Sequence, residues 1–253
     1  MNMLLSTMYS DVIVIIPSRL SSERLPRKPL AEIGDMTMIE HVATRVLASG
    51  IENVYVATDS DEIAKVISAR NIKVIMTDSS CPTGTDRVYQ AFQSLRENKN
   101  IKYIINIQGD MPFIDSVSIV KIIDELRKNR FDIITPVAKV GRDIADNLSN
   151  AKVVVGINNQ ALYFSRSLIP YGAEEYLYHV GIYGFKKEAL TKFVNLTHSK
   201  YERVEKLEQL RALENGMTIG ICYSDAVPIS VDTEEDLAKA RHYASINNNP
   251  GQV

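Results

Sequence analysis

The sequence has few cysteines and no long apolar segment, and these absences exclude several classes of protein. Its 253 residues include two cysteines, Cys81 and Cys222, which are far apart and not in a CxxC spacing. Both are expected to be reduced thiols, with no cysteine-based metal site. No apolar run approaches the roughly 20 residues that a membrane-spanning helix needs. The first residues lack the basic and apolar regions of a secretory signal, so a cytoplasmic protein without membrane contact is expected.

An excess of one charge is also missing. Lysine and arginine total 29 against 31 acidic residues, which gives a net charge of −2. This balance provides no general basic field, so nucleic acid is not expected as a partner. The hydrophobic fraction of 45% and charged fraction of 24% are ordinary for a globular protein. The length suits one large α/β domain with a substantial core.

Several familiar motifs are absent as well. The chain has no GxGxxG after its first apolar run and no GxxxxGK[ST], which disfavours a dinucleotide dehydrogenase and a P-loop enzyme. It also has no GxSxG and no HExxH, so neither a nucleophile elbow nor that zinc motif is present.

The first half of the chain alternates predicted strands and helices. Short apolar runs predict strands at residues 12–16, 53–57, 72–76, 103–107 and 132–136. Amphipathic patterns between them predict helices at residues 38–48, 60–69, 84–96 and 115–128. Repeated βα units with apolar strands predict a mostly parallel sheet covered on both faces.

The second half has a different pattern. Strands are predicted at residues 152–155, 161–164, 179–185 and 218–222, and helices at residues 187–194, 200–214 and 233–244. On the helix at 200–214, Val204, Leu207 and Leu210 form the apolar stripe. Glu208 and Arg211 fall beside Val204, either as a surface pair or as polar groups that reach a cleft.

A basic loop follows the first predicted strand. It carries one acid, Glu23, and four cations: Arg19, Arg24, Arg27 and Lys28. Its three prolines, Pro17, Pro26 and Pro29, prevent it from forming a helix. Ligands of open α/β sheets bind at the carboxyl ends of the strands. The loop therefore indicates a site for a polyanion such as a nucleoside triphosphate, although a solvated surface loop is the alternative.

Two acids are candidate metal ligands. Asp110 follows the strand at 103–107, at the same predicted sheet edge as the basic loop. A carboxylate beside bound phosphates is the expected ligand of Mg²⁺. Asp232 lies where a strand-like segment meets a helix. The alternatives are a turn aspartate at position 110 and a helix-start acid at position 232.

Two further segments could contact a ligand. The helix start at Thr83-Gly84-Thr85-Asp86-Arg87 could hold ribose, base or phosphate oxygens, or could simply be an N-cap. Along the strand at 179–185, His179, Gly181 and Tyr183 would share one face. The missing side chain at Gly181 would leave a slot for a sugar or carboxylate, whereas a structural histidine is the alternative.

These segments together resemble the 3-deoxy-manno-octulosonate (Kdo) cytidylyltransferases from Val12 to about Leu237. The matching segments are IPSRLSSERLPRKPL, VATD, TGTDRV, NIQGDMP, NAKVVV…ALYFSRSLIP, HVGIYGF, EKLEQLRALENG and VDTEEDL. The resemblance implies a single Rossmann-like α/β nucleotidyltransferase domain with a mostly parallel sheet and a smaller β-rich region for sugar and dimer contacts. The expected parts are nucleotide binding at about 10–137, acceptor and dimer at about 138–230, and a closing metal-site strand and helix at 231–246.

The resemblance also implies an activity and its residues. CTP and Kdo would give CMP-Kdo and pyrophosphate with Mg²⁺, supplying activated sugar for lipopolysaccharide, in a homodimer. The triphosphate would be held by Arg19, Arg24 and Lys28, and Mg²⁺ by Asp110 and Asp232. Thr85 and Arg87 would lie near the cytidine. The sugar side would be lined by Gln108, which also borders the nucleotide, and by His179, Tyr183, Glu208 and Gln209.

The chain departs from the family pattern in four places. Arg27 replaces a usual Gly and would add a cation near the phosphates, and Ser230 also replaces a Gly. Met111 replaces a usual Glu, and the connector at 171–178 is short. The last two bear on the acceptor, so an 8-amino relative of Kdo is an alternative. A synthetase for sialic-acid-like nonulosonates is disfavoured by LSSERLPRKP, and a non-catalytic nucleotide-binding domain is disfavoured by the presence of both acids.

Overall fold

The computed structural model describes residues 8–22, 24–96 and 99–247, which fall into two compact units. Unit 1 is Met1–Asn100, Asn106–Ser116 and Pro228–Val253, and unit 2 is Ile101–Ile105 and Val117–Val227. The functional parts predicted from the sequence divide the chain near residues 137 and 230. Residues 117–137 pack with unit 2 because the strand that begins at Ile133 pairs with later strands of that unit.

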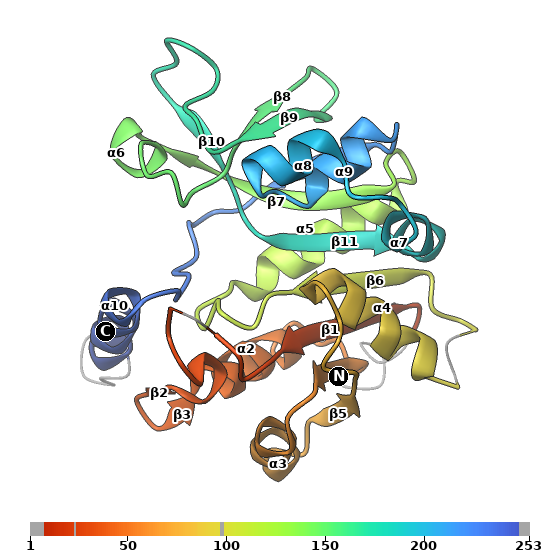
Figure 1. The fold of residues 1–253 in the computed structure, drawn as a ribbon, viewed down its shortest axis with the longest axis vertical. Coiled ribbons are helices and arrows are strands. Elements are labelled where there is room, and N and C mark those ends of the chain that lie inside the picture. Colours follow the sequence, from red (N-terminus) through yellow and green to blue (C-terminus); the bar gives the residue numbers. More distant parts are fainter. Residues whose placement is uncertain (1–7, 23, 97–98, 248–253) are drawn as a thin grey trace. The chain divides into compact units, whose positions relative to one another are not determined.

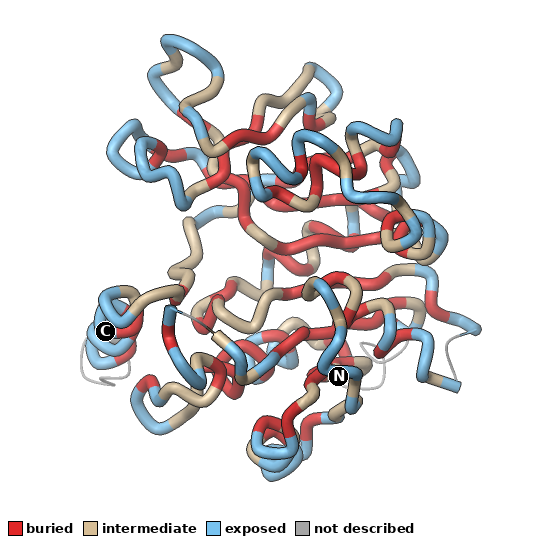
Figure 2. Tube along the Cα trace, viewed as in Figure 1, coloured by how far each residue is buried: buried red, intermediate tan, exposed pale blue. Residues whose placement is uncertain are grey.

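Unit 1 contains the parallel part of the sheet (Figure 1). Strand β1 (Val12–Ser18) pairs in parallel with β4 (Val54–Thr58), which pairs in parallel with β5 (Lys73–Met76). On its other side β1 neighbours β6 (Tyr103–Ile107). Every residue of β1 is buried, as Figure 2 shows, because its β-branched residues pack on both faces of the sheet.

The helices of unit 1 match their predicted positions within a few residues. They are α2 (Met38–Leu47), α3 (Asp61–Ala69) and α4 (Gly84–Ser94). The Ser60 hydroxyl caps α3 by accepting from the Ile63 amide, and Thr83 caps α4 in the same way through Asp86. Each helix therefore begins where a side-chain oxygen satisfies its first free amides.

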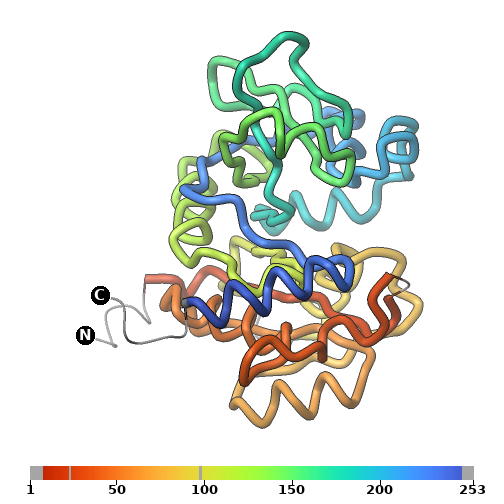
Figure 3. The backbone as a smooth tube through the Cα atoms, turned by 90° about the vertical axis from the view of Figure 1, so that its left-hand side faces the viewer, coloured from red at the N-terminus to blue at the C-terminus, as the bar shows by residue number. Residues whose placement is uncertain are grey.

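The C-terminal helix α10 (Glu234–Asn247) contributes to unit 1 although it is last in the chain. Its side chains Leu237 and Ala240 share a buried cluster with Leu25, Met38 and Val231. Figure 3 shows α10 lying along the early segments, which are η1 (Lys28–Leu30), β2 (Glu32–Ile33) and β3 (Met36–Thr37). A capping box lies at its start, since the Thr233 amide donates to Asp236 Oδ2 and the Asp236 amide donates to Thr233 Oγ1.

Unit 2 is built around β7 (Ile133–Val140). This strand is antiparallel to β10 (Tyr176–His179) and β11 (Ile182–Lys186), and it is parallel to β12 (Ile219–Tyr223). Beyond β10 the sheet continues through β8 (Lys152–Val155) to its edge strand β9 (Ala161–Ser165). The helices are α5 (Ser116–Arg127), α6 (Arg142–Ala145), α7 (Lys187–Val194), α8 (Lys200–Glu205) and α9 (Gln209–Glu214).

Two elements of unit 2 differ from the sequence prediction. The strand predicted at 179–185 is two strands, β10 and β11, with Val180 and Gly181 between them. The helix predicted at 200–214 is also two helices, which separate at Lys206 because this residue has a positive φ of 54°. The predicted apolar stripe is wrong for the same reason, since Val204 is exposed while Leu207 and Leu210 are buried.

Among the helices of the described residues, none has the length and the apolar character that a membrane span requires.

Candidate active site

The carboxyl ends of β1 and β6 and the start of α4 border a cavity of about 810 Å³ within unit 1. A volume of this size is typical of small-ligand sites. The cavity is lined by seven of the predicted site residues, which are Arg19, Arg24, Lys28, Arg87, Gln108, Asp110 and Asp232. The structure therefore brings the basic loop and both predicted acids to one place. The argument from the sheet edge predicted this for Asp110, whereas the place of Asp232 was implied by the family resemblance.

The two acids share a single cation. The Lys28 ammonium nitrogen lies 2.9 Å from Asp110 Oδ2 and 3.0 Å from Asp232 Oδ1. The Arg24 guanidinium also lies 3.1 Å from Asp232 Oδ1. The two carboxylates, far apart in the sequence, are therefore close enough for one cation to contact both.

These contacts determine the charge states of Asp232 and Lys28. Burial alone would raise the pKa of Asp232, but the attraction and hydrogen bonds of Lys28 and Arg24 outweigh it and lower the pKa. Burial likewise opposes the charged form of Lys28, yet Asp110 and Asp232 raise its pKa above the usual value. The carboxylate of Asp232 and the ammonium of Lys28 therefore both stay ionised at neutral pH.

Packing holds the acids and the basic loop together. The Val231 amide donates to the Asp110 carbonyl at 2.9 Å, which joins the segments that carry the two acids. Val231 and Leu25 are both in the buried cluster with α10, so the middle of the basic loop is fixed beside Asp232. Glu23, the acid predicted within this loop, lies outside the described residues.

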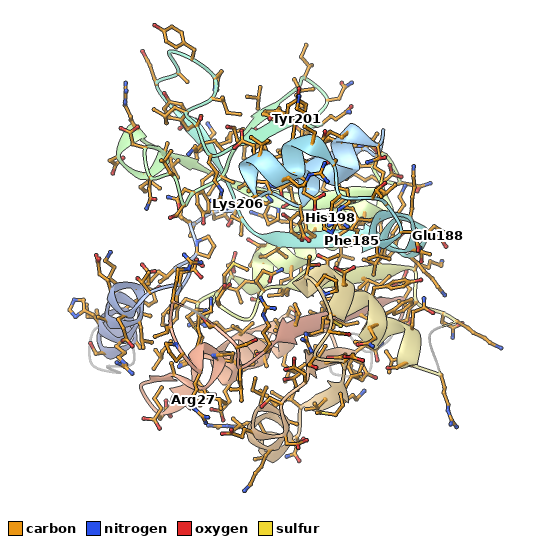
Figure 4. All side chains as sticks on the ribbon, viewed as in Figure 1. Arg27, Phe185, Glu188, His198, Tyr201 and Lys206 are labelled. Carbon is orange, nitrogen blue, oxygen red and sulfur yellow. The ribbon has the colours of Figure 1, made fainter. Side chains whose placement is uncertain are left out.

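Arg27 does not have the position predicted for it. It caps η1 with a left-handed φ of 58°, is exposed, and does not line the cavity. Its guanidinium pairs instead with Glu62 at the start of α3. Arg27 is labelled in Figure 4. Arg27 therefore pairs outside the cavity lining, and the structure gives no support to the expectation of an extra cation near the phosphates. A glycine would adopt this φ more easily.

Arg87 is held rigidly at the wall of the cavity. Its guanidinium donates to Asp59 Oδ2 at 2.8 Å and to Thr77 Oγ1 at 2.5 Å, and the residue is buried. Thr85 is buried behind the lining and accepts a hydrogen bond from the Asn106 amide at 3.0 Å. Arg87 therefore presents a fixed positive charge to the cavity, whereas Thr85 supports the wall.

Two glycines allow the backbone to approach closely at the floor of the cavity. A Cβ at Gly84 would lie 3.3 Å from Gln108 Oε1, and one at Gly109 would lie 3.2 Å from the Pro17 carbonyl. The end of β1, the start of α4 and the turn after β6 can therefore meet around a ligand with little side-chain bulk between them.

Ser18 is a site residue that the sequence reasoning missed. It is the last residue of β1, is 6% exposed and lines the cavity. Within the described part of the chain, its buried hydroxyl has no hydrogen-bond partner. An unpaired buried hydroxyl is costly unless a ligand or water completes it. Its position at the carboxyl end of a buried strand, next to Arg19, was the available signal.

Gln108, predicted for both the nucleotide and the sugar side, lines the cavity of unit 1, and the other residues predicted for the sugar side lie in unit 2. His179 and Tyr183 have ring centroids 5.4 Å apart, although they come from β10 and β11 and not from one strand. The Tyr183 hydroxyl donates to Gln209 Oε1 at 3.0 Å. The Gln209 amide nitrogen is buried and has no partner among the described residues. His179, Tyr183 and Gln209 thus form one buried polar cluster, and Glu208 lies beside it as the N-cap of α9.

His179 is neutral and has a defined tautomer. Burial lowers the pKa of its imidazole to about 3. The Thr135 hydroxyl lies 2.7 Å from the Ile182 carbonyl and 2.9 Å from His179 Nε2. Because the carbonyl can only accept, the hydroxyl donates to it and accepts from the Nε2 hydrogen of His179. Burial, aided by the negative charge of Glu208, raises the pKa of the Tyr183 phenol, so both rings are uncharged.

Arg211 is neither a surface partner of Glu208 nor free to reach a cleft. It is buried and donates from Nε and Nη2 to Glu202 at 2.7–3.0 Å. Its guanidinium also lies 4.6 Å from the ring centroid of Phe193. The break at Lys206 turns α9 relative to α8, which is why both options considered for a continuous helix are wrong for Arg211.

The acids of the cavity suit a magnesium ion. Among the described residues there is no cluster of three or more metal-ligating side chains. Two carboxylates that already share one cation fit Mg²⁺, since this ion usually takes one or two carboxylates and completes its shell with phosphate oxygens and water.

Comparison with known proteins identifies the family of the chain. Residues 13–219 match the sequence family described as cytidylyltransferase. A 3-deoxy-manno-octulosonate cytidylyltransferase of Rickettsia africae is 59% identical over 94% of this chain and 98% of its own length. The corresponding protein of Rickettsia bellii is 58% identical over 92% of this chain and 95% of its own.

Comparison with solved structures identifies the fold. A CMP:2-keto-3-deoxy-manno-octonic acid synthetase complexed with CTP superposes with a TM-score of 0.88 at 34% identity, covering 94% of this chain and 99% of that one. A glucose-1-phosphate thymidylyltransferase from Bacillus anthracis, described as putative, reaches a TM-score of 0.65 at 15% identity and shares only the fold, with 92% and 95% of the two chains covered. The predicted Rossmann-like nucleotidyltransferase fold is thus confirmed, and the chain belongs to the 3-deoxy-manno-octulosonate cytidylyltransferase family.

Proposed function

We propose that this chain transfers a cytidylyl group from CTP to Kdo, giving CMP-Kdo and pyrophosphate for lipopolysaccharide synthesis. The observation that carries the proposal is the cavity in which Asp110 and Asp232 meet Arg24 and Lys28. Family membership supports the same conclusion, since relatives nearly 60% identical over almost the whole chain bear the name of this activity.

In the proposed reaction the anomeric hydroxyl oxygen of the sugar forms a bond to the α-phosphorus of CTP. The bond from this phosphorus to the bridging oxygen breaks, pyrophosphate leaves with its electron pair, and the proton of the anomeric hydroxyl passes to solvent water. Arg19, Arg24 and Lys28 line the cavity and would hold the triphosphate and stabilise the charge that develops on the leaving group. Arg87, fixed by Asp59, and Gln108 would border the nucleoside.

Asp110 and Asp232 would hold Mg²⁺ in this proposal. When bound, the ion supplies Lewis-acid polarisation of the phosphoryl oxygens. The chain's own part is to present both carboxylates ionised at the edge of the triphosphate site. Lys28 and Arg24 favour that charge state for Asp232 by lowering its pKa.

In unit 2, the acceptor would be bound by His179, Tyr183, Glu208 and Gln209. Neutral imidazole and phenol groups and a free amide donor suit the hydroxyl and carboxylate groups of a 2-keto acid sugar. Met111, one of the departures from the family pattern, is buried and does not line the cavity of unit 1.

The proposal includes a homodimer and a cytoplasmic site of action. The family resemblance supports the dimer, and the supply of CTP inside cells supports the location. Sedimentation equilibrium tests the dimer directly, because a single species at the monomer mass over the working concentration range would contradict it.

A pyrophosphate-release assay with CTP tests the activity. Kdo, 8-amino-Kdo and a sialic acid are compared as acceptors, and we expect the highest kcat/KM with Kdo. Asp110→Asn should reduce Mg²⁺-dependent turnover by about 100-fold or more while keeping the fold. Asp61→Asn, an exposed acid at the start of α3, is the matched control. Binding of CTP with no release for any acceptor would support the non-catalytic alternative and overturn the proposal.

A further inference from the structure

We propose that the Lys28 ammonium occupies the place between Asp110 and Asp232 that a divalent cation would take, so that metal binds only together with the triphosphate. Lys28 is then a positioning residue that keeps the two acids paired before substrate arrives. The inference rests on the proposed function, because it assumes that these acids are the metal ligands.

The first observation is the position of the Lys28 ammonium between the two carboxylates. One nitrogen atom contacts a carboxylate oxygen of each acid, at 2.9 and 3.0 Å, which is the arrangement of a shared cation. The Lys28 side chain is only 15% exposed, so little solvent screens its charge. A divalent ion that binds both carboxylates must therefore displace the ammonium or bear its repulsion at close range.

The local backbone allows the ammonium to move without moving the loop. The Lys28 amide donates to the Leu25 carbonyl, and the neighbouring Pro29 and Leu25 are buried, which fixes the main chain. The side chain itself is a flexible four-carbon stem that ends in a compact charge. Lys28 can thus swing between acceptors while its Cα stays in place.

A triphosphate provides the second acceptor. Lys28 lines the same cavity as Arg19 and Arg24, where phosphate oxygens would lie. When the ammonium turns to these oxygens, both carboxylates are released to a metal ion at the same moment. Arg24 cannot act in this way, since of the two acids it pairs with Asp232 alone, and its side chain is 63% exposed.

Two consequences follow. The protein without nucleotide should bind divalent metal weakly, because its acids are already neutralised by an internal cation. CTP should strengthen metal binding and metal should strengthen CTP binding by the same factor, since coupling between two ligands is reciprocal. The acids are meanwhile never left unpaired, which avoids their mutual repulsion in the empty protein.

Calorimetric titration with Mn²⁺ alone, without nucleotide, tests the inference. Lys28→Met should bind Mn²⁺ at least about tenfold more tightly than the unaltered protein, whereas Lys28→Arg, which keeps the charge, should not. Lys65→Met, which removes an exposed lysine from α3, controls for net charge and should leave the affinity unchanged. Equal or weaker Mn²⁺ binding by Lys28→Met would overturn the inference.

A replacement variant and an activity assay complete the test. If Lys28→Met does not fold, Lys28→Gln retains a hydrogen-bond donor without the charge and should give the same gain in Mn²⁺ affinity; no gain there also overturns the inference. The activity assay separates the two proposals. A protein that binds Mn²⁺ as expected but releases no pyrophosphate contradicts the proposed function alone, whereas an active protein with unchanged Lys28→Met affinity contradicts only the role of Lys28.

Discussion

The side chains that line the cavity differ in whether their polar atoms are already paired within the protein. Arg24, Lys28, Asp110 and Asp232 neutralise one another, and Arg87 is held by Asp59. Against these paired groups, the Ser18 hydroxyl stands out because it is buried and has no partner among the residues that the structure describes. A group left unpaired in the ligand-free protein is a candidate for direct contact with the ligand, since binding would remove an existing cost.

Ser18→Ala should weaken CTP binding and leave stability unchanged. The variant loses one hydrogen bond to the ligand, which corresponds to roughly a 3- to 30-fold increase in Kd. No bond within the protein is lost, so the thermal unfolding midpoint should stay the same or rise slightly. Calorimetric titration with CTP and thermal unfolding measure the two effects.

A matched buried serine gives the control. Ser118 is 3% exposed and its hydroxyl bonds the Ser224 hydroxyl at 3.1 Å. Ser118→Ala should therefore lower the unfolding midpoint while the Kd for CTP stays constant. Unchanged CTP affinity in Ser18→Ala would show that this hydroxyl faces water and not the nucleotide.

Residue types at the ends of strands were enough to predict the centre of the site. Asp110 and the basic loop both follow buried strands, and parallel strands place their carboxyl ends at one edge. The side chain of Arg27 could not be placed in this way. Its direction depends on a left-handed backbone conformation that nothing in the local sequence requires of an arginine.

At the scale of elements, periodicity predicted where strands and helices lie but not where they break. The apolar alternation continues through Val180 and Gly181, so β10 and β11 read as one strand. Thr135 on β7 bonds the carbonyls of both Val180 and Ile182, a tertiary contact that turns the chain there. The sequence also gives no signal for the break between α8 and α9 at Lys206, because glycine, and not lysine, is the residue that usually ends a helix in this way.

Lys206→Gly should stabilise the protein. Lys206 ends α8 with a φ of 54°, where glycine has no steric penalty, and its amide donates to the Glu202 carbonyl in a bond that any residue can make. We expect a gain of about 0.5–1 kcal/mol in the free energy of unfolding, after the greater freedom of glycine in the unfolded chain is counted. Urea unfolding at neutral pH measures it.

The same substitution within a regular helix is the control. Lys192 is exposed inside α7, and Lys192→Gly should cost about 1 kcal/mol, since glycine is a poor helix former. If both variants lose stability equally, the strain assigned to Lys206 is absent.

At the scale of the whole molecule, both units contain ion pairs, and unit 2 also has an uncharged polar cluster in its interior. Unit 1 pairs Lys28 with Asp110 and Asp232 at its cavity, and unit 2 pairs Arg211 with Glu202. The rings of His179 and Tyr183 in unit 2 are uncharged. Because a buried neutral histidine affects stability at mildly acidic pH, the pH dependence of unfolding between 6.5 and 5 should report on His179.

His179 should make the protein less stable as the pH falls through this range. Its pKa is about 3 in the folded protein, because burial disfavours the charged ring, and about 6.5 once unfolded. Between these values the unfolded chain binds one more proton than the folded one, so stability is full above pH 6.5 and is lost as the pH falls. Phe164, Thr135 and Tyr183 face the ring, and none carries a charge that would offset this effect.

Urea unfolding at pH 6.5 and pH 5 gives the size of the effect. His179 should account for a loss of about 1.5 kcal/mol between these two pH values. His179→Gln should remove that part of the pH dependence, although its stability at pH 6.5 will be lower because the contact with Thr135 changes. His242→Gln alters an exposed histidine of α10 and should keep the full slope. A slope that survives in His179→Gln would mean that the imidazole is open to solvent and titrates normally, which would remove the neutral cluster on which the proposed acceptor site depends.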